Sequence, residues 1–362
     1  MEDVFISFRR GFPFDEVAEI GKSIEDAKIF VPGYIPPEVG LMDLRGFMYT
    51  QEYEQYDVVI LPDRNLVSRM ARAQRDGMGG APDQPMKNAV NVLAFAKAMD
   101  MLMEPSIAFH ELAHHGGSDL AYEELAWFRT ADNHDTWEWI EAALGRRSSF
   151  SASPQRHLGE DAKRDLSYPL NRWRRNYIVA LKIAELELKP LPHIEKALQL
   201  LHWLYQDFLL AGPAALFASL YFSPNGSRKR LIKYLRSPDR DRAIEGAKNA
   251  AWDITYLSDF AERVLKSEQE RRRYIFATSD KSLARVAPLL VNDLYDLDGD
   301  AGLAAALGAW WPQGEAKRIV STLIDYMSRS DAPDRHNNQP APADFIDRLT
   351  ECGEECLRSS KL

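Results

Sequence analysis

Four acidic residues of this chain have the sequence surroundings of metal-binding carboxylates. Two follow short apolar runs, and the other two interrupt apolar stretches of helical pattern. A carboxylate among apolar neighbours is unfavourable unless it is paired or binds a metal ion. Clustered carboxylates suit Mg²⁺ or Mn²⁺, and two such ions can activate water and stabilise the leaving oxygen of a phosphodiester. The four residues are Asp63, Glu111, Asp253 and Asp280.

A second pattern, HELAH at residues 110–114, has the form H-E-x-x-H. On a helix, His110 and His114 lie one turn apart on one face and can share Zn²⁺, with Glu111 as a general base. The pattern resembles the zincin metallopeptidases. The extended zincin motif would need a third histidine where this chain has Leu120. Carboxylates that could replace that histidine as third ligand are Glu123, Glu124, Glu138 and Glu141, and the sequence singles out none of them.

The first and last acids follow segments that have the pattern of buried strands. Residues 58–61 are four consecutive apolar residues, which is typical of a parallel strand buried on both faces. Pro62 cannot donate to a sheet ladder, so the strand should end there. Residues 274–277 form a similar run before Asp280. Because α/β proteins bind ligands at the carboxyl edge of parallel strands, we expect Asp63 and Asp280 at that edge. Both also stand where a residue can cap the helix that follows.

Glu111 and Asp253 are expected on helices. The helix with Glu111 should begin near Pro105 and break at the glycine pair 116–117, and Asp253 should lie within a long helix over 241–266. We also expect strands at 4–8 and 28–31, a loop at 76–85, and helices at 14–27, 89–103, 120–129, 136–144, 170–188, 193–210, 214–221, 283–291, 301–311, 315–327 and 343–358.

In this order, the motifs resemble those of the PIN-like nucleases. The matching segments are VVILPDRN, PSIAFHELA, AAWDITYLSDFA and YIFATSDKSLARVA. The resemblance implies a PIN-like α/β/α sandwich with a short parallel sheet, and cleavage of RNA that depends on Mg²⁺ or Mn²⁺. It implies that Asp63, Glu111, Asp253 and Asp280 are the catalytic acids and metal ligands, supported by Asn65 and Thr278. A PIN-like module that binds RNA or protein without cleavage is the non-catalytic alternative, and a zinc peptidase is the alternative enzyme.

The spacing of the motifs predicts the domain organisation. Residues 1–55 would form an N-terminal extension and residues 56–300 the catalytic domain, with a helical insertion at about 117–248. Residues 301–362 would form C-terminal helices with a mobile, proline-rich linker at 331–342. The long spacing between Glu111 and Asp253, and Pro62 before the first acid, depart from compact members of the family. Substrate preference and regulation therefore stay open, as does a role as toxin, defence effector or processing enzyme.

Two basic runs, NRWRRN at 171–176 and SRKRLIK at 227–233, interrupt an otherwise acidic chain. They can line a groove for phosphates, with Trp173 stacking on a base, or they can be solvated helix faces. The candidate RNA-binding residues are Arg172, Arg174, Arg175, Arg228, Lys229 and Arg230.

The composition of the chain excludes some classes of protein. The chain has 362 residues, a formal charge of −9 and only two cysteines, so we expect neither a nucleic-acid coat protein nor a disulfide framework. No apolar run approaches the ~20 residues of a membrane span, and no secretory signal is evident, so we expect a cytoplasmic protein with no membrane partner. The apolar C-terminal helices are compatible with a homodimer. A regulatory protein partner is a separate alternative.

Overall fold

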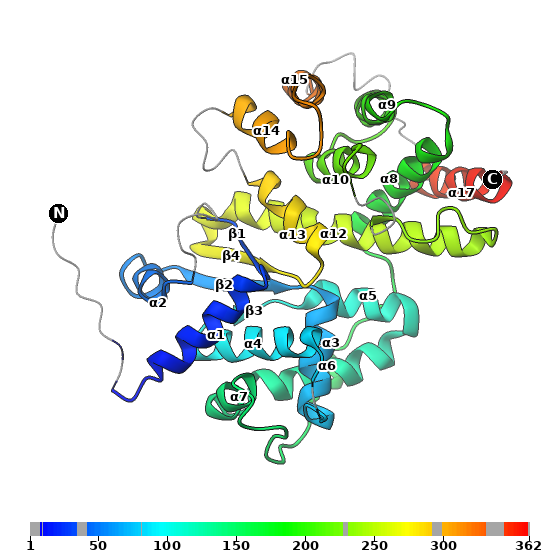
Figure 1. Cartoon of the computed structure of the whole chain (residues 1–362). Coiled ribbons are helices and arrows are strands. Elements are labelled where there is room, and N and C mark those ends of the chain that lie inside the picture. The colour runs from blue at the N-terminus through cyan, green and yellow to red at the C-terminus, as the bar shows by residue number, and fades with distance from the viewer. Residues whose placement is uncertain are drawn as a thin grey trace. The chain divides into compact units, whose positions relative to one another are not determined.

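The computed structural model describes residues 8, 10–34, 42–80, 82–226, 231–291, 299–330 and 344–360. These residues form a helix-rich α/β structure with one four-stranded sheet in the order β1-β4-β2-β3 (Figure 1). The chain divides into two compact units. The first comprises Met1–Pro169 and Glu262–Ala284, and the second comprises Leu170–Ala261 and Arg285–Leu362.

The sheet belongs to the first unit. Its central strand β2 (Asp57–Pro62) lies between two parallel neighbours, β4 (Arg272–Ala277) and β3 (Leu102–Met103). The strand β1 (Phe30–Pro32) joins β4 in the antiparallel sense. The sheet is therefore mixed, and the prediction of a purely parallel sheet is wrong at this edge. Many mostly parallel sheets carry one such antiparallel edge strand.

The two predicted buried strands are confirmed. Residues 58–61 of β2 are at most 5% exposed, and β2 ends at Pro62 as expected. Residues 274–277 of β4 are also buried. The strand predicted at 28–31 is present as β1, shifted by one or two residues. The strand predicted at 4–8 lies, except for Phe8, outside the described residues.

The helix predicted over 89–103 is wrong at its end. The observed helix α4 stops at Ala98, and β3 takes up residues 102–103. Between them Asp100 adopts a left-handed conformation with φ of 52°, and the amide of Met101 donates to the carbonyl of Ala96. This six-residue hydrogen bond is a common way of ending a helix. It turns the chain so that residue 102 can pair with Val59 of β2.

The remaining described elements of the first unit are helical. The glycine break predicted at 116–117 separates α5 from α6, and Gly117 has a φ of 86° that favours glycine. The elements are α1 (Phe14–Asp26), α2 (Leu44–Met48), the π-helical turn η1 (Tyr49–Tyr53), α3 (Arg64–Asp76), α4 (Gln84–Ala98), α5 (Ser106–Gly116), α6 (Ser118–Asp132), α7 (Thr136–Ala143), the 3₁₀ turn η2 (Glu160–Ala162) and the start of α13 (Lys281–Val286).

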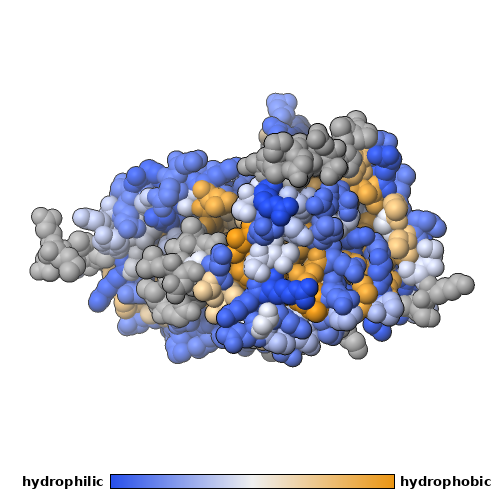
Figure 2. Space-filling model, turned by 90° about the horizontal axis from the view of Figure 1, so that it is seen from above, coloured by the Kyte–Doolittle hydropathy of each residue, from blue (hydrophilic) through white to orange (hydrophobic). Residues whose placement is uncertain are grey.

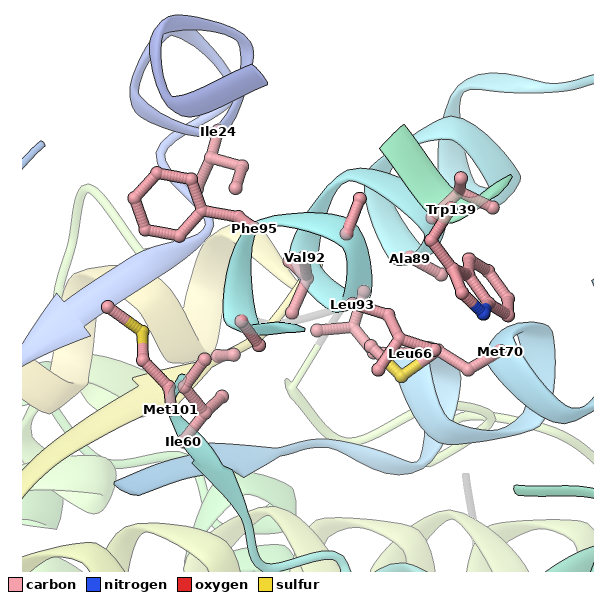
Figure 3. Packing of buried hydrophobic residues seen from close by; sticks show 14 of the residues in the cluster. Ile24, Ile60, Leu66, Met70, Ala89, Val92, Leu93, Phe95, Met101 and Trp139 are labelled. Carbon is pink, nitrogen blue, oxygen red and sulfur yellow. The ribbon is translucent and has the colours of Figure 1, made fainter. Parts of the chain in front are cut away.

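One apolar cluster holds these elements together, with α4 at its centre (Figure 3). It receives side chains from α1, β2, α3, α4 and α7. Because α3 contributes Leu66 and Met70 to this cluster, the core fixes the helix whose first turn follows Asp63. The labelled members are Ile24, Ile60, Leu66, Met70, Ala89, Val92, Leu93, Phe95, Met101 and Trp139.

The described part of the second unit is helical, and its helices agree with the predicted ranges within a few residues. They are α8 (Asn171–Leu188), α9 (His193–Gln206), α10 (Gly212–Phe222), η3 (Ala287–Leu290), α14 (Asp300–Leu307), α15 (Gln313–Ser328) and α17 (Phe345–Ser359). The long helix α12 (Arg240–Glu270) begins in the second unit and ends in the first. The predicted linker at 331–342 lies outside the described residues.

The face drawn in Figure 2 is largely polar. Hydrophilic residues cover most of the face in Figure 2, and apolar residues lie between them in separate groups. Within the described ranges, no helix is both long and apolar enough to cross a membrane.

Candidate functional site

Asp63 and Thr278 meet at the carboxyl edge of the sheet. Pro62 of β2 is paired with Ala277 of β4, so the residues that follow these two strands are neighbours. The amide of Asp63 donates to the carbonyl of Ala277 at 2.9 Å, and the hydroxyl of Thr278 donates to Asp63 Oδ2 at 2.6 Å. The edge predicted from the two apolar runs is therefore formed by direct contacts between β2 and β4.

Asp63 is a buried carboxylate that caps a helix. Its side chain is held by the amide of Leu66, which donates to Oδ1 at 2.9 Å, and the residue is only 2% exposed. Burial raises the pKa of Asp63 to about 6, although hydrogen bonds from Thr278 and from the amides of Leu66 and Ser279 act in the opposite direction. Among the described residues, no lysine, arginine or histidine forms an ion pair with Asp63. In the part of the chain that the structure describes, hydrogen bonds rather than ion pairs stabilise its charge.

Asp280 lies beside Asp63 and caps the next helix. Its Oδ1 accepts from the amides of Ser282 at 2.7 Å and Leu283 at 3.3 Å. The amide of Asp280 donates to the hydroxyl of Thr278 at 2.9 Å. Its negative charge contributes to the raised pKa of Asp63. One threonine thus contacts both acids, and both of them cap helices as well as sharing the edge.

Glu111 comes from the third element that leaves this edge. Because β3 runs parallel to β2, the helix that follows it, α5, starts at the same side of the sheet, and α5 packs on α3. Glu111 is partly buried on α5. In the described part of the chain, however, no group of three or more His, Cys, Asp or Glu side chains is placed to hold a metal ion. The structure brings Asp63 and Asp280 together, and among the described residues Glu111 does not complete a group of three with them.

Asp253 and Asn65 stay predictions. Asp253 is partly buried on the portion of α12 that belongs to the second unit. Asn65 is exposed in the first turn of α3, where its carbonyl accepts a hydrogen bond from Arg69 at 2.9 Å. The hydrogen bonds given for Asn65 join its carbonyl to Ser68 and Arg69.

The two carboxylates at the edge suit magnesium better than zinc. Mg²⁺ retains several waters and commonly binds proteins through one or two carboxylates together with substrate phosphates. Catalytic zinc usually takes three protein ligands. If the edge binds a metal ion, Asp63 and Asp280 would be donors of the kind that Mg²⁺ or Mn²⁺ takes, and the ion would offset the unfavourable burial of the Asp63 charge.

The HELAH helix shows one feature of a zinc site. The Nδ1 atom of His110 lies 3.2 Å from the carbonyl oxygen of Leu166, and a zinc-binding histidine commonly donates its second ring N–H in this way. The segment with Leu166 is held by Ser118, whose hydroxyl accepts from the amide of Leu166 at 3.0 Å. The rings of His114 and His115 are in edge-to-face contact. Over the described ranges the third ligand is lacking, as stated above.

Sequence reasoning missed Asn88, which reaches the edge from α4. Its amide nitrogen lies 3.5 Å from the hydroxyl of Ser279, and its oxygen accepts from Gln84 at 2.8 Å. The available signal was a polar residue within an otherwise apolar helix, where burial requires hydrogen-bond partners.

The first basic run does not form the expected stacking surface. Trp173 is only 4% exposed and stacks on Tyr177, so its role as a platform for a base is wrong. Its position on the apolar face of α8 explains the burial.

The basic residues of the two runs are only partly described. Arg172 pairs with Asp259 at 2.8 Å, and Arg174 pairs with Asp347. Arg175 is exposed. Arg228, Lys229 and Arg230 lie outside the described residues. A role for these arginines and this lysine in RNA binding stays a prediction.

In the comparisons with known proteins, no family model matches the chain, and no curated protein or solved structure is significantly similar to it.

Proposed function

We propose that this protein is a metal-dependent ribonuclease that hydrolyses RNA phosphodiesters at the Asp63–Asp280 edge. The observation that carries the proposal is the state of Asp63. It is fully buried beside a second carboxylate, and its pKa is raised to about 6. Strongly perturbed carboxylates that lack a partner charge are typical of functional sites, because structural acids are normally neutralised by the protein.

The residues of the edge have distinct roles in this proposal. Thr278 orients both acids, because its hydroxyl donates to Asp63 and accepts from the amide of Asp280. Asp63 and Asp280 would hold Mg²⁺ or Mn²⁺, which would supply the charge that polarises the phosphate and the attacking water. Glu111 and Asp253 are the further ligands that the motif order predicts. RNA as the substrate is supported by the resemblance of the four motifs to PIN-like nucleases.

The experiment is cleavage of single-stranded RNA by the full chain with added Mg²⁺ or Mn²⁺. Wild-type protein should cleave, and Asp280→Asn should abolish cleavage while circular dichroism shows an unchanged fold. Asparagine caps helices about as well as aspartate, so the substitution removes charge without removing the cap. Asp135→Asn is the matched control, because Asp135 is exposed and caps α7 through the amide of Glu138 at 3.0 Å. Full activity of Asp280→Asn would refute the assignment.

A zinc peptidase is the second candidate, favoured by the contact of His110 with the Leu166 carbonyl. Elemental mass spectrometry of protein purified without chelator or affinity metal separates the two. About one zinc per chain would support the peptidase site. Absence of zinc, together with RNA cleavage that chelator abolishes and Mg²⁺ restores, would support the acidic edge. RNA binding without cleavage under any of these conditions would support the non-catalytic alternative.

A further inference from the structure

Three arginines recur every third residue along α3, the helix that Asp63 caps. Residues at this spacing are neighbours on one helix face. Together with α6, which packs on α3, they border a pocket of about 310 Å³. Its lining includes Arg69, Arg72, Arg75, Ser68, Glu124 and Trp127.

The charges around this pocket are only partly neutralised. Glu124 is occupied by Arg64, whose two terminal nitrogens donate to its two oxygens at 2.5 and 3.0 Å. Arg75 is likewise paired with Asp76 at 2.9 and 2.8 Å. In contrast, Arg69 and Arg72 form no ion pair with any described residue. Two guanidinium groups therefore border the pocket without an ion pair to any described carboxylate, although the chain as a whole carries −9 and the charge of Arg72 acts on Asp76.

Arg69 also has an unmet hydrogen-bond donor. Its Nη1 donates to the carbonyl of Asn65 at 2.9 Å. Its Nε is shielded from solvent and has no acceptor among the described residues. A buried donor without an acceptor is unfavourable, and an anion in the pocket would not reach this shielded atom. What favours an anionic ligand is the position of Arg69 and Arg72 in the lining of the pocket, where neither forms an ion pair with a described residue.

We propose that this pocket binds the phosphodiester backbone of single-stranded RNA, next to the cleavage site. The inference deepens the proposed ribonuclease function and rests on it for the identity of the strand. Arginine binds phosphate oxygens through paired N–H groups, and the half-buried indole of Trp127 offers a surface on which a base can stack. The volume is at the lower end of small-molecule sites and suits one nucleotide unit.

The position of the pocket along α3 suits a strand that also reaches Asp63. At 1.5 Å per helical residue, Arg69 lies about 9 Å from Asp63 along the helix axis and Arg75 about 18 Å. A short stretch of strand spans these axial distances, so a strand held at the arginines can extend to the end of α3 that Asp63 caps. An acidic peptide would pair with the arginines but would have no use for Trp127 or for the adjoining acids.

The test measures binding separately from cleavage. Fluorescence anisotropy with a 5′-labelled oligouridine of twelve nucleotides, in EDTA, reports binding by the full chain when no divalent metal is present. Arg72→Gln should weaken binding roughly fivefold, and the slope of log affinity against log salt should become shallower by about 0.7, as expected for one lost phosphate contact on a single strand. Arg45→Gln is the matched control, because Arg45 is exposed on α2 and does not line the pocket.

A second variant tests the base contact. Trp127→Leu should weaken binding of the oligouridine but not of an abasic strand of equal length, because only the former has bases to stack. A general folding defect would weaken both equally and would count against the stacking role.

The possible outcomes separate this inference from the proposed function. Binding that depends on Arg72, without cleavage in Mg²⁺ or Mn²⁺, would support the pocket and refute the ribonuclease. Equal binding by Arg72→Gln and Arg45→Gln would overturn the pocket, whether or not the protein cleaves RNA. Competition by polyglutamate as strong as that by unlabelled oligouridine would also overturn it, since the site would then recognise charge alone.

Discussion

Asp63 and Glu138 are both shielded carboxylates of the first unit, and their surroundings shift their pKa values in opposite directions. Burial raises the pKa of Asp63 to about 6. Burial acts in the same sense on Glu138, but hydrogen bonds from His134 and Ser151 and the charge of Arg147 outweigh it and lower the pKa to about 2. The opposite pKa shifts arise because the two carboxylates have different hydrogen-bond and charge partners.

Glu138 ties a loop to α7. Its Oε2 lies 2.9 Å from Nε2 of His134 and 2.8 Å from Nη1 of Arg147, and it accepts from the amide of Ser151 at 2.8 Å. On its other side, the His134 ring contacts the hydroxyl of Ser153 at 3.0 Å. This network holds the segment at 147–153 against the start of α7, so the carboxylate of Glu138 has a structural role.

A carboxylate that stabilises the fold has positively charged partners here, and Asp63 has none among the described residues. Glu138 receives an arginine and a histidine, whereas Asp63 receives a threonine, two backbone amides and a second acid. The arrangement around Asp63 keeps its charge unfavourable until something else binds. Such a compromise of stability is common at functional sites.

The largest expected difference between the two acids is in activity. Asp63→Asn should lower the rate of RNA cleavage by about a hundredfold or more, because it removes a charge from the reacting centre. Glu138→Gln should stay within a few-fold of wild type. Initial rates on single-stranded RNA in Mn²⁺ measure both. If Asp63→Asn and Glu138→Gln lost cleavage activity equally, Asp63 would affect the rate only by stabilising the fold.

The next difference is in the dependence of stability on pH. The pKa of Asp63 in the folded state, about 6, lies above the ordinary value of 3.8 that we take for the unfolded chain. The folded state therefore holds a proton that the unfolded chain releases, and this contribution is fully present below about pH 4 and is lost as pH rises through 6. The loss is on the order of 3 kcal/mol.

Because asparagine does not ionise, the free energy of unfolding of Asp63→Asn relative to wild type should rise between pH 4 and pH 7. Urea denaturation at several pH values measures this difference. A difference that stays constant over this range would show that burial of the Asp63 charge carries no penalty.

The smallest effect is expected for Glu138. Its pKa in the folded state lies below its ordinary value of 4.5, so its contribution is present above that pH and is lost as pH falls through about 2. Glu138→Gln should reduce the free energy of unfolding by about 1–2 kcal/mol at pH 7 and should make the protein less sensitive to acid. Urea denaturation of Glu138→Gln and wild type at several pH values measures both effects. An increase in stability at pH 7 would contradict the structural role.

Local pattern was enough to predict the two strands and the acids that follow them. Four consecutive apolar residues at 58–61 leave the solvent only if both faces of the strand are buried. Pro62 has no N–H to donate, so it ends the hydrogen-bond ladder of the strand. The caps made by Asp63 and Asp280 are equally local, because each accepts from an amide two or three residues ahead. These features depend on short-range chemistry, which a sequence displays directly.

The contacts that make the edge a site depend on segments far apart in the chain. Pairing of Pro62 with Ala277 brings the hydroxyl of Thr278 onto Asp63 across more than two hundred residues. The two-residue strand β3 is too short for any periodicity to reveal, and the pairing of Arg64 with Glu124 arises only where α3 packs on α6. Register, burial and the balance of charge are set by such packing. The raised pKa of Asp63, and the lack of an ion pair between Arg69 or Arg72 and any described residue, therefore became visible only in the folded chain.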